Sequence, residues 1–203
     1  MRAQPLFAAL ILATLGCAML AGCTPSAAPA APTSPHATGP VGSPANPLVI
    51  TCGMEAWPGS PAPPAPVRPG RRDLAVGPLY FAGARSLAST KPARHGYAPF
   101  GRHGRFYKFG MVVRPGTTVT VTIGASQRGH AVIALAEGAA TSVTYHACRR
   151  AGGFFAQGFA FTRPPYRGCV PVSARIGNSA AVWNGVVSLF AGSCAAGRPG
   201  GAD

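Results

Sequence analysis

Acidic residues are scarce in this chain of 203 residues, which has 4 Asp and Glu against 18 Lys and Arg and a formal net charge of +14. Apart from the terminal Asp203, the carboxylates are Glu55, Asp73 and Glu137, and each stands in an apparent loop. Glycoside hydrolysis needs two carboxyl groups that flank one cleft. A catalytic carboxylate pair is therefore not expected.

The motifs of common hydrolases and metal sites are also lacking. The sequence has no Gly-x-Ser-x-Gly elbow, no Ser-x-x-Lys, no Cys-x-x-Cys and no His-x-His pair. Its five histidines are spread along the chain as His36, His95, His103, His130 and His146. Two alternatives stay open: a hydrolase that uses one of these histidines as its base, and a copper or zinc site built from His130, His146, Met54 and Met111. The main prediction is a protein that is not an enzyme and holds no metal or cofactor.

Apolar runs of membrane-spanning length are lacking too, because the longest, residues 6–20, falls short of the about 20 residues that a spanning helix needs. Arg2 precedes this run, and Leu20-Ala21-Gly22-Cys23 ends it. This stretch resembles the lipobox of bacterial lipoproteins. The resemblance implies a signal peptide at residues 1–22, a lipid on Cys23 and a place on the outer side of the cytoplasmic membrane. Thr14-Leu15-Gly16-Cys17 matches less well, and an uncleaved span or plain secretion are the alternatives.

Residues 24–47 form a low-complexity tract rich in Pro and Ala, with almost no large apolar side chain. Such a tract cannot bury enough surface to fold. Its prolines favour polyproline II, in which 24 residues reach roughly 70 Å. We therefore predict that the lipidated Cys23 and a disordered stalk occupy residues 23–47.

The cysteines that remain after Cys17 and Cys23 are Cys52, Cys148, Cys169 and Cys194. An even number in an oxidising compartment predicts two disulfides, and four cysteines allow three pairings. We favour Cys148 with Cys169, because they are close in sequence and bracket a Gly-rich excursion. Cys52 would then pair with Cys194 and tie the first strand to the last.

The clearest strand signal lies in residues 106–113 and 117–123, on either side of Arg114-Pro115-Gly116. Pro115 and Gly116 suit the two central positions of a type II turn. In the second run Val119, Val121 and Ile123 alternate with threonines, which is the period of a strand with one buried face. The two runs predict a β-hairpin.

Other apolar runs of strand length are residues 48–52, 74–82, 131–136, 141–148, 152–161, 169–176 and 181–190. Gly77-Pro78 suggests an edge strand or a bend within residues 74–82, and residues 131–136 suit a strand or a short helix. Six prolines in residues 57–72 exclude a central strand there. About eight or nine short strands without an amphipathic helix predict an all-β fold: a single antiparallel β-sandwich, Ig-like or jelly-roll-like, with a small barrel as the alternative. We place this domain at residues 48–196 and a flexible tail at residues 197–203.

The positive charge would favour nucleic acid as a binding partner. Export argues against this partner, because nucleic acid lies inside the cell. Anionic lipid headgroups and anionic envelope polymers lie within its reach. The basic loop at residues 85–105 leads into the central strands and interleaves cations with aromatic rings. Its candidate anion-binding residues are Arg94, Tyr97, Arg102, His103, Arg105 and Tyr107, with His95 and Phe100 among them. A solvated loop without a ligand is the plainer alternative.

Several segments of residues 48–194 resemble a group of uncharacterised actinobacterial lipoproteins and secreted proteins. They include VTYHAC, GGFFAQGFAF and YRGCVPVSARI. The resemblance implies a disulfide-bonded β domain and carries no known activity. Together with the lipobox it leads us to expect an envelope lipoprotein anchored in the cell membrane. Its expected role is that of a non-catalytic binding or structural module, whose partner is an anionic polymer or another envelope protein. The alternative is an envelope hydrolase or metal-binding protein.

Overall fold

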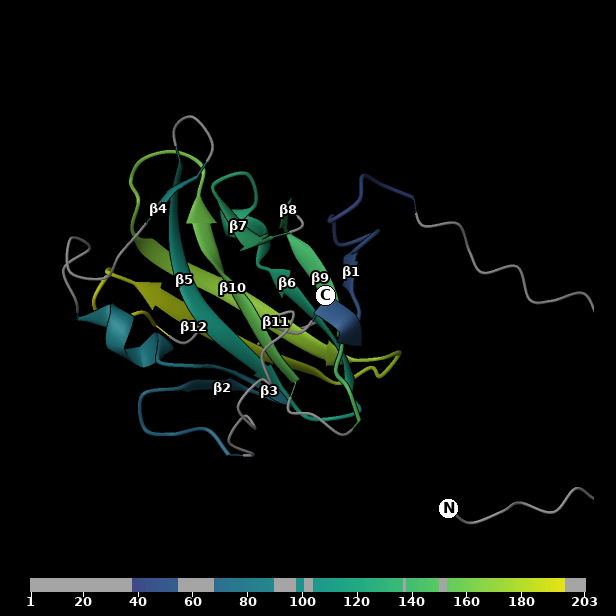
Figure 1. Ribbon diagram of the computed structural model, residues 1–203. Helices are drawn as coiled ribbons and strands as arrows, with labels where there is room; N and C mark the ends of the chain where they lie inside the picture. The colour runs from purple at the N-terminus through teal and green to yellow at the C-terminus, as the bar shows by residue number, and fades with distance from the viewer. Residues whose placement is uncertain are drawn as a thin grey trace, which may run out of the picture. The chain divides into compact units, whose positions relative to one another are not determined.

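The computed structural model describes residues 38–54, 68–89, 98–100, 104–136, 138–149 and 153–195, with residues 98–100 described by their backbone alone. All of them belong to the compact unit Ala37–Asp203. Two sheets rich in antiparallel pairs pack face to face, and the described residues form no α-helix (Figure 1). The predicted β-sandwich is therefore confirmed.

One sheet has five strands. In spatial order they are β1 (Leu48–Ile50), β9 (Ser142–His146), β6 (Thr118–Ile123), β11 (Gly168–Ile176) and β12 (Val182–Leu189). β1 runs parallel to β9, whereas the other neighbours are antiparallel. The edges of this sheet are therefore β1 and β12.

The second sheet has seven strands. The order is β2 (Leu74–Val76), β3 (Leu79–Phe81), β5 (Gly104–Val113), β10 (Gly153–Phe161), β7 (Ala131–Leu135) and β8 (Gly138–Ala140), and β4 (Ala98–Phe100) also pairs with β5. Short 3-10 helices stand at η1 (Cys52–Met54), η2 (Ala84–Ala88) and η4 (Ala125–Gln127). Gly77-Pro78 thus lies in a tight turn between two paired strands, β2 and β3.

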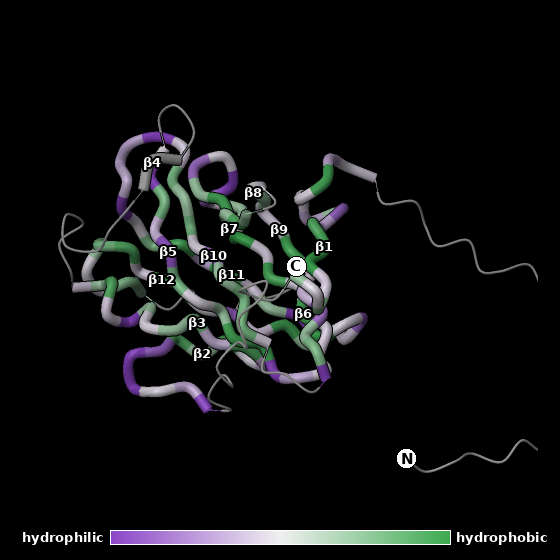
Figure 2. The backbone as a smooth tube through the Cα atoms, viewed as in Figure 1, coloured by the Kyte–Doolittle hydropathy of each residue, from purple (hydrophilic) through white to green (hydrophobic). Residues whose placement is uncertain are grey.

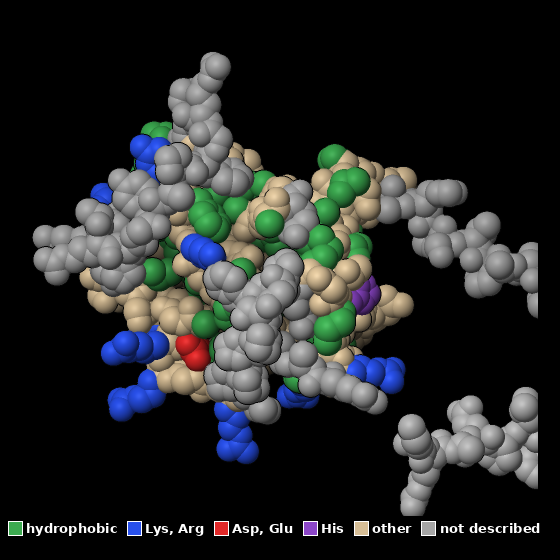
Figure 3. Space-filling view, in the orientation of Figure 1, with side chains coloured by type: hydrophobic (Ala, Val, Ile, Leu, Met, Phe, Trp, Pro, Cys, Tyr) green, Lys and Arg blue, Asp and Glu red, His purple; other side chains and the backbone are tan. Residues whose placement is uncertain are grey.

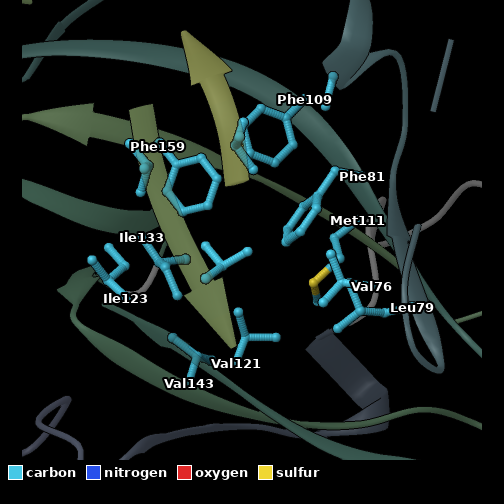
Figure 4. Close-up of a cluster of buried hydrophobic side chains, with 14 of the residues drawn as sticks. Val76, Leu79, Phe81, Phe109, Met111, Val121, Ile123, Ile133, Val143 and Phe159 are labelled. Atoms are coloured by element: carbon cyan, nitrogen blue, oxygen red, sulfur yellow. The ribbon is translucent and has the colours of Figure 1, made fainter. Parts of the chain in front are cut away.

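The core fills the space between the sheets, and Figure 2 shows hydrophobic stretches along the strands with hydrophilic connections. The predicted alternation in β6 is confirmed, because Val119, Val121 and Ile123 are buried while the threonines between them are partly exposed. In the seven-stranded sheet Phe81 and Phe109 meet edge to face at 5.6 Å, and Phe159 packs against both (Figure 4). Contacts of this kind add to the gain from burying the rings.

A single polar pair bridges β9 and β10 inside this core, as far as the described residues show. The Tyr145 hydroxyl donates to Oε1 of Gln157, and both side chains are almost fully buried. No buried side-chain polar atom of the described residues lacks a hydrogen-bond partner. The pair therefore avoids the cost of leaving a polar group unsatisfied in the core.

The predicted hairpin of residues 106–123 is wrong, although its turn is present. Thr117 donates its backbone N–H to the Arg114 carbonyl at 3.2 Å, and Gly116 has φ 69°, as a type II turn requires. The two arms lie in different sheets, because β5 pairs with β3, β4 and β10 while β6 pairs with β9 and β11. The turn crosses the sandwich, which lets the buried face of each arm meet the other sheet.

The predicted disulfide pairing is also wrong, although all four cysteines are bonded. The bridges are Cys52–Cys148 and Cys169–Cys194, with Cα separations of 4.9 and 5.7 Å. Cys52 follows β1 and Cys148 follows β9, and the parallel pairing of these strands brings their ends together. β9 and β11 both run antiparallel to β6, so Cys148 and Cys169 lie at opposite ends of the sheet.

The folded part begins before residue 48, within the stretch assigned to the stalk. Backbone amides of Thr141 and Ser142 donate to the Gly42 carbonyl at 2.8 and 2.9 Å. The same stretch closes on itself, because Gly42 donates its amide to the Asn46 carbonyl at 2.7 Å. Residues 38–47 therefore lie against the start of β9. The remainder of the stalk, the signal segment, residues 57–67 of the Pro-rich excursion and the tail at residues 197–203 lie outside the described residues.

Candidate functional site

Charge is the first feature of the surface, because Asp73 is the only carboxylate among the described residues. The described cations are Arg68, Arg71, Arg72, Arg85, Arg105, Lys108, Arg114, Arg128, Arg149, Arg163, Arg167 and Arg175. Figure 3 shows Lys and Arg side chains around the lower rim, with one acidic side chain among them near η2 and β2. The described surface is therefore strongly cationic.

Asp73 serves the backbone rather than this surface. Its Oδ2 accepts the amide N–H of Gly70 and its Oδ1 accepts that of Gly83, both at 2.7 Å. Arg85 then donates from Nε to the backbone carbonyl of Asp73 at 2.8 Å. The Asp73 carboxylate thus holds the backbone at Gly70 and at Gly83, and the Asp73 carbonyl holds the Arg85 guanidinium.

The predicted anion-binding loop lies largely outside the described residues, since Arg94, Tyr97, Arg102 and His103 are not described. Tyr107 is described, and its predicted role is wrong. The side chain is 2 % exposed, and its ring packs 4.7 Å from Phe190 and 6.2 Å from Phe161. β5 turns this residue into the core, so it cannot stack on a ligand.

Arg105 lies near the surface, where it contacts a different loop from the one predicted. Its guanidinium lies over the ring of Tyr166 at 5.1 Å, and its Nη1 donates to the Gly104 carbonyl at 3.0 Å. The loop that carries Tyr166 joins β10 to β11 and also holds Arg163 and Arg167. We call Arg105, His130, Arg163, Tyr166 and Arg167 the basic corner. The sequence feature that marks this corner is RPPYR at residues 163–167, a basic and aromatic stretch between two strand runs.

Two hydrogen bonds hold the loop of the basic corner. Tyr107 donates its hydroxyl to the Tyr166 carbonyl at 2.6 Å, and Nε2 of His130 lies 2.9 Å from the Arg163 carbonyl. Nδ1 of His130 lies 3.2 Å from Oε1 of Gln127. Both ring nitrogens of His130 are therefore used in positioning.

The alternative site of two histidines and two methionines is not assembled. His130 precedes β7, whereas His146 ends β9 at the other end of the sandwich and its Nδ1 lies 2.9 Å from the Thr118 hydroxyl. Met111 is fully buried in β5, and Met54 is exposed in η1. Glu137 lies outside the described residues. Within the described part of the chain no three His, Cys, Asp or Glu side chains gather as metal ligands.

A cavity of about 580 Å³ lies at the open edge of the sandwich, between β2, β12 and η2. Arg85, Asn184, Ser188 and Ser193 supply polar groups to its lining. The other lining residues are Leu74, Ala75, Ala84, Ala88, Gly185, Val186, Gly192 and Cys194. Its size is typical of small-molecule sites. We call it the edge cavity. No local sequence pattern marks it, because its walls come from segments about 100 residues apart.

A smaller hollow of about 300 Å³ lies on the seven-stranded sheet. Its lining is mostly apolar and comes from β5, β7 and β10, with Lys108 as its charged side chain. None of the described residues forms a helix with the length and hydrophobicity to cross a membrane.

No family model, curated protein or solved structure matches this chain. The resemblance to actinobacterial lipoproteins therefore stays a prediction, and so does the lipobox.

Proposed function

We propose that this protein is a lipid-anchored lipoprotein of the bacterial cell envelope whose β-sandwich binds anionic envelope material without catalysis. The observation that carries the proposal is the unbalanced charge of the described surface. Its single described carboxylate, Asp73, accepts backbone amides with both oxygens, while twelve described side chains are Lys or Arg. Such a surface attracts anionic lipid headgroups and polymers within a Debye length, about 8 Å at physiological salt.

The two disulfides support a place outside the cytoplasm. Cys52–Cys148 and Cys169–Cys194 engage every cysteine among the described residues. Disulfides persist in oxidising compartments and are rare in the cytosol. Export through the signal at residues 1–22 and lipidation at Cys23 would account for them.

The basic corner is the part of the surface that fits an anionic polymer best. Arg163 and Arg167 lie on an exposed loop whose backbone is fixed by Tyr107 and His130. A guanidinium presents a rigid fork of donors that suits phosphate and carboxylate groups. A preorganised loop also loses less entropy on binding.

Binding of the purified protein to an immobilised phosphate polymer, measured across a salt titration, tests the proposal. We expect affinity to fall steeply with salt, and the double variant Arg163→Gln, Arg167→Gln to bind more weakly. The matched variant Arg163→Lys, Arg167→Lys keeps the charge and should retain most of the binding. Affinity that is independent of salt, or no binding by the unaltered protein, would contradict the proposal.

The anchor has a separate test. Cys23→Ala should release the protein from the membrane fraction, whereas Cys17→Ala should leave it bound. Mass spectrometry of the native protein should find an amino terminus at Cys23 with attached lipid. A terminus at Met1, or an unmodified sulfur on Cys23, would rule the anchor out.

A further inference from the structure

We infer that the edge cavity is a binding site for a hydroxylated unit that carries an anionic group, such as a sugar or polyol bearing phosphate or carboxylate. The inference rests on the proposed function only for the source of this ligand, the anionic envelope. The cavity itself is argued from Arg85, Asn184 and the segments that enclose them.

The side chain of Arg85 is positioned to donate hydrogen bonds to an anion. It lies in η2 at the wall of the cavity, and its Nε donates to the Asp73 carbonyl at 2.8 Å. Asp73 is itself fixed by the amides of Gly70 and Gly83. Among the described residues the terminal nitrogens of Arg85 have no hydrogen-bond partner. Its guanidinium therefore keeps two parallel donors for a phosphate or carboxylate.

Asn184 supplies a neutral polar group to the same cavity. It lies on β12, is exposed, and within the described structure its side-chain amide bonds to no other residue. An amide both donates and accepts, which suits a sugar or polyol hydroxyl. Ser188 is less suitable, because its hydroxyl already donates to the Gly192 carbonyl at 2.7 Å.

The wall between η2 and β12 is fixed by backbone and covalent bonds. Phe190 and Gly192 donate their amides to the carbonyls of Leu87 and Ala88, both at 3.1 Å. Cys194, which lines the cavity, is tied to Cys169 at the start of β11. Figure 1 shows η2 beside β12 at this edge. A cavity with such fixed walls is largely formed before a ligand arrives, which favours affinity.

The floor follows from a close approach of the two sheets. A Cβ placed on Gly185 of β12 would come within 2.6 Å of Val76 of β2. The edges of the two sheets therefore touch at this point, and Gly185 lines the cavity there.

Titration of the full-length protein with glycerol 3-phosphate, glucuronate, inorganic phosphate and glycerol, followed by calorimetry, tests the site. We expect saturable binding of at least one of the two hydroxylated anions, weaker binding of inorganic phosphate and none of glycerol. The stronger of glycerol 3-phosphate and glucuronate identifies the anionic group. Binding of neither, or equal binding of glycerol, overturns the inference.

Variants locate the binding. Arg85→Gln should lower the affinity about 10- to 100-fold, and Arg85→Lys should also lower it, because Lys keeps the charge and loses the fork. Asn184→Ala should lower it about 3- to 10-fold. The matched control Arg149→Gln removes one exposed cation that follows β9, far across the five-stranded sheet from β12, and should change the affinity less than about 2-fold. Near-ultraviolet circular dichroism checks that each variant is folded.

The outcomes separate this inference from the proposed function. If Arg85→Gln and Arg149→Gln behave alike toward the small anions, the edge cavity is not the site, even where the phosphate polymer still binds. If the small anions bind through Arg85 and the polymer does not bind at all, the cavity stands and the proposed function fails.

Discussion

The hydroxyl of Tyr107 donates a hydrogen bond to the backbone carbonyl of Tyr166 across 59 positions of sequence, at 2.6 Å. The bond joins a core residue of β5 to the loop between β10 and β11. That loop places the Tyr166 ring under the Arg105 guanidinium. A buried hydroxyl thus positions a basic surface that it does not itself form.

Tyr107→Phe should lower the free energy of unfolding by about 1 kcal/mol, because it removes this hydrogen bond and leaves the ring in place. Urea denaturation measures the change. An unfolding free energy that Tyr107→Phe leaves unchanged would show that the bond does not hold the loop.

The two disulfides should differ in their effect on stability. Replacing Cys52 and Cys148 by Ser opens a loop with a sequence separation of 96, and the Cys169 and Cys194 pair opens one of 25. Loop entropy predicts losses of about 4.7 and about 3.5 kcal/mol. Urea denaturation of both double variants tests the order.

The pairing itself can be read from an unreduced tryptic digest. Cleavage after arginine leaves the four cysteines on four separate peptides. Mass spectrometry should find the Cys52 peptide joined to the Cys148 peptide. A Cys148–Cys169 pair would contradict the parallel placement of β1 against β9.

The raised pKa of Tyr80 predicts that the free energy of unfolding falls at alkaline pH. Burial, and then the charge of Asp73, raises the pKa of Tyr80 above its ordinary value of 10.0. The unfolded chain therefore loses this proton at a lower pH than the folded protein does. The contribution of Tyr80 to the free energy of unfolding is complete below about pH 10. It is lost as the pH rises through the pKa of Tyr80 in the folded protein.

Urea midpoints measured between pH 8 and about pH 11 should show this fall. The variant Tyr80→Phe has no phenol to titrate, so its midpoint should fall less over the same range. If both proteins lose stability in parallel, Tyr80 is not the group responsible.

The paired hydroxyls of Thr120 and Thr144, 2.8 Å apart on the outer face of the five-stranded sheet, should be energetically coupled. Thr120→Val and Thr144→Val should each cost about 1 kcal/mol of unfolding free energy. The double variant should cost clearly less than the sum, because both partners of the bond are gone. Combining Thr120→Val with Thr162→Val, which are not partners, should be additive within about 0.5 kcal/mol.

Gly158 should tolerate no side chain. A Cβ there would lie 2.0 Å from the Tyr107 carbonyl oxygen and 2.4 Å from the Phe106 ring. Gly158→Ala should therefore cost about 3 kcal/mol in a urea denaturation experiment. Gly53→Ala meets no atom within 4 Å and should change stability by less than about 0.5 kcal/mol. Equal effects would mean that β5 and β10 lie farther apart than described.

The sequence by itself determined the longer strands, because a side chain's burial in a strand follows the local period of two. It did not indicate the short strands β4 and β8, and it gave the β2–β3 pair as a single run. The alternation in β6 therefore placed Val121 and Ile123 in the core correctly. It also identified the turn at Pro115-Gly116 and the presence of two disulfides, since both depend on residue type.

Only the tertiary structure decided which strands are neighbours. The Pro115-Gly116 turn is compatible with a hairpin or with a crossing between sheets, and the choice depends on β3, β9, β10 and β11, which are remote in sequence. The same pairing set the disulfide partners, turned Tyr107 inward and brought Arg85 and Asn184 to the lining of one cavity. Local periodicity carries no information on such contacts, because they arise when whole sheets bury their apolar faces against each other.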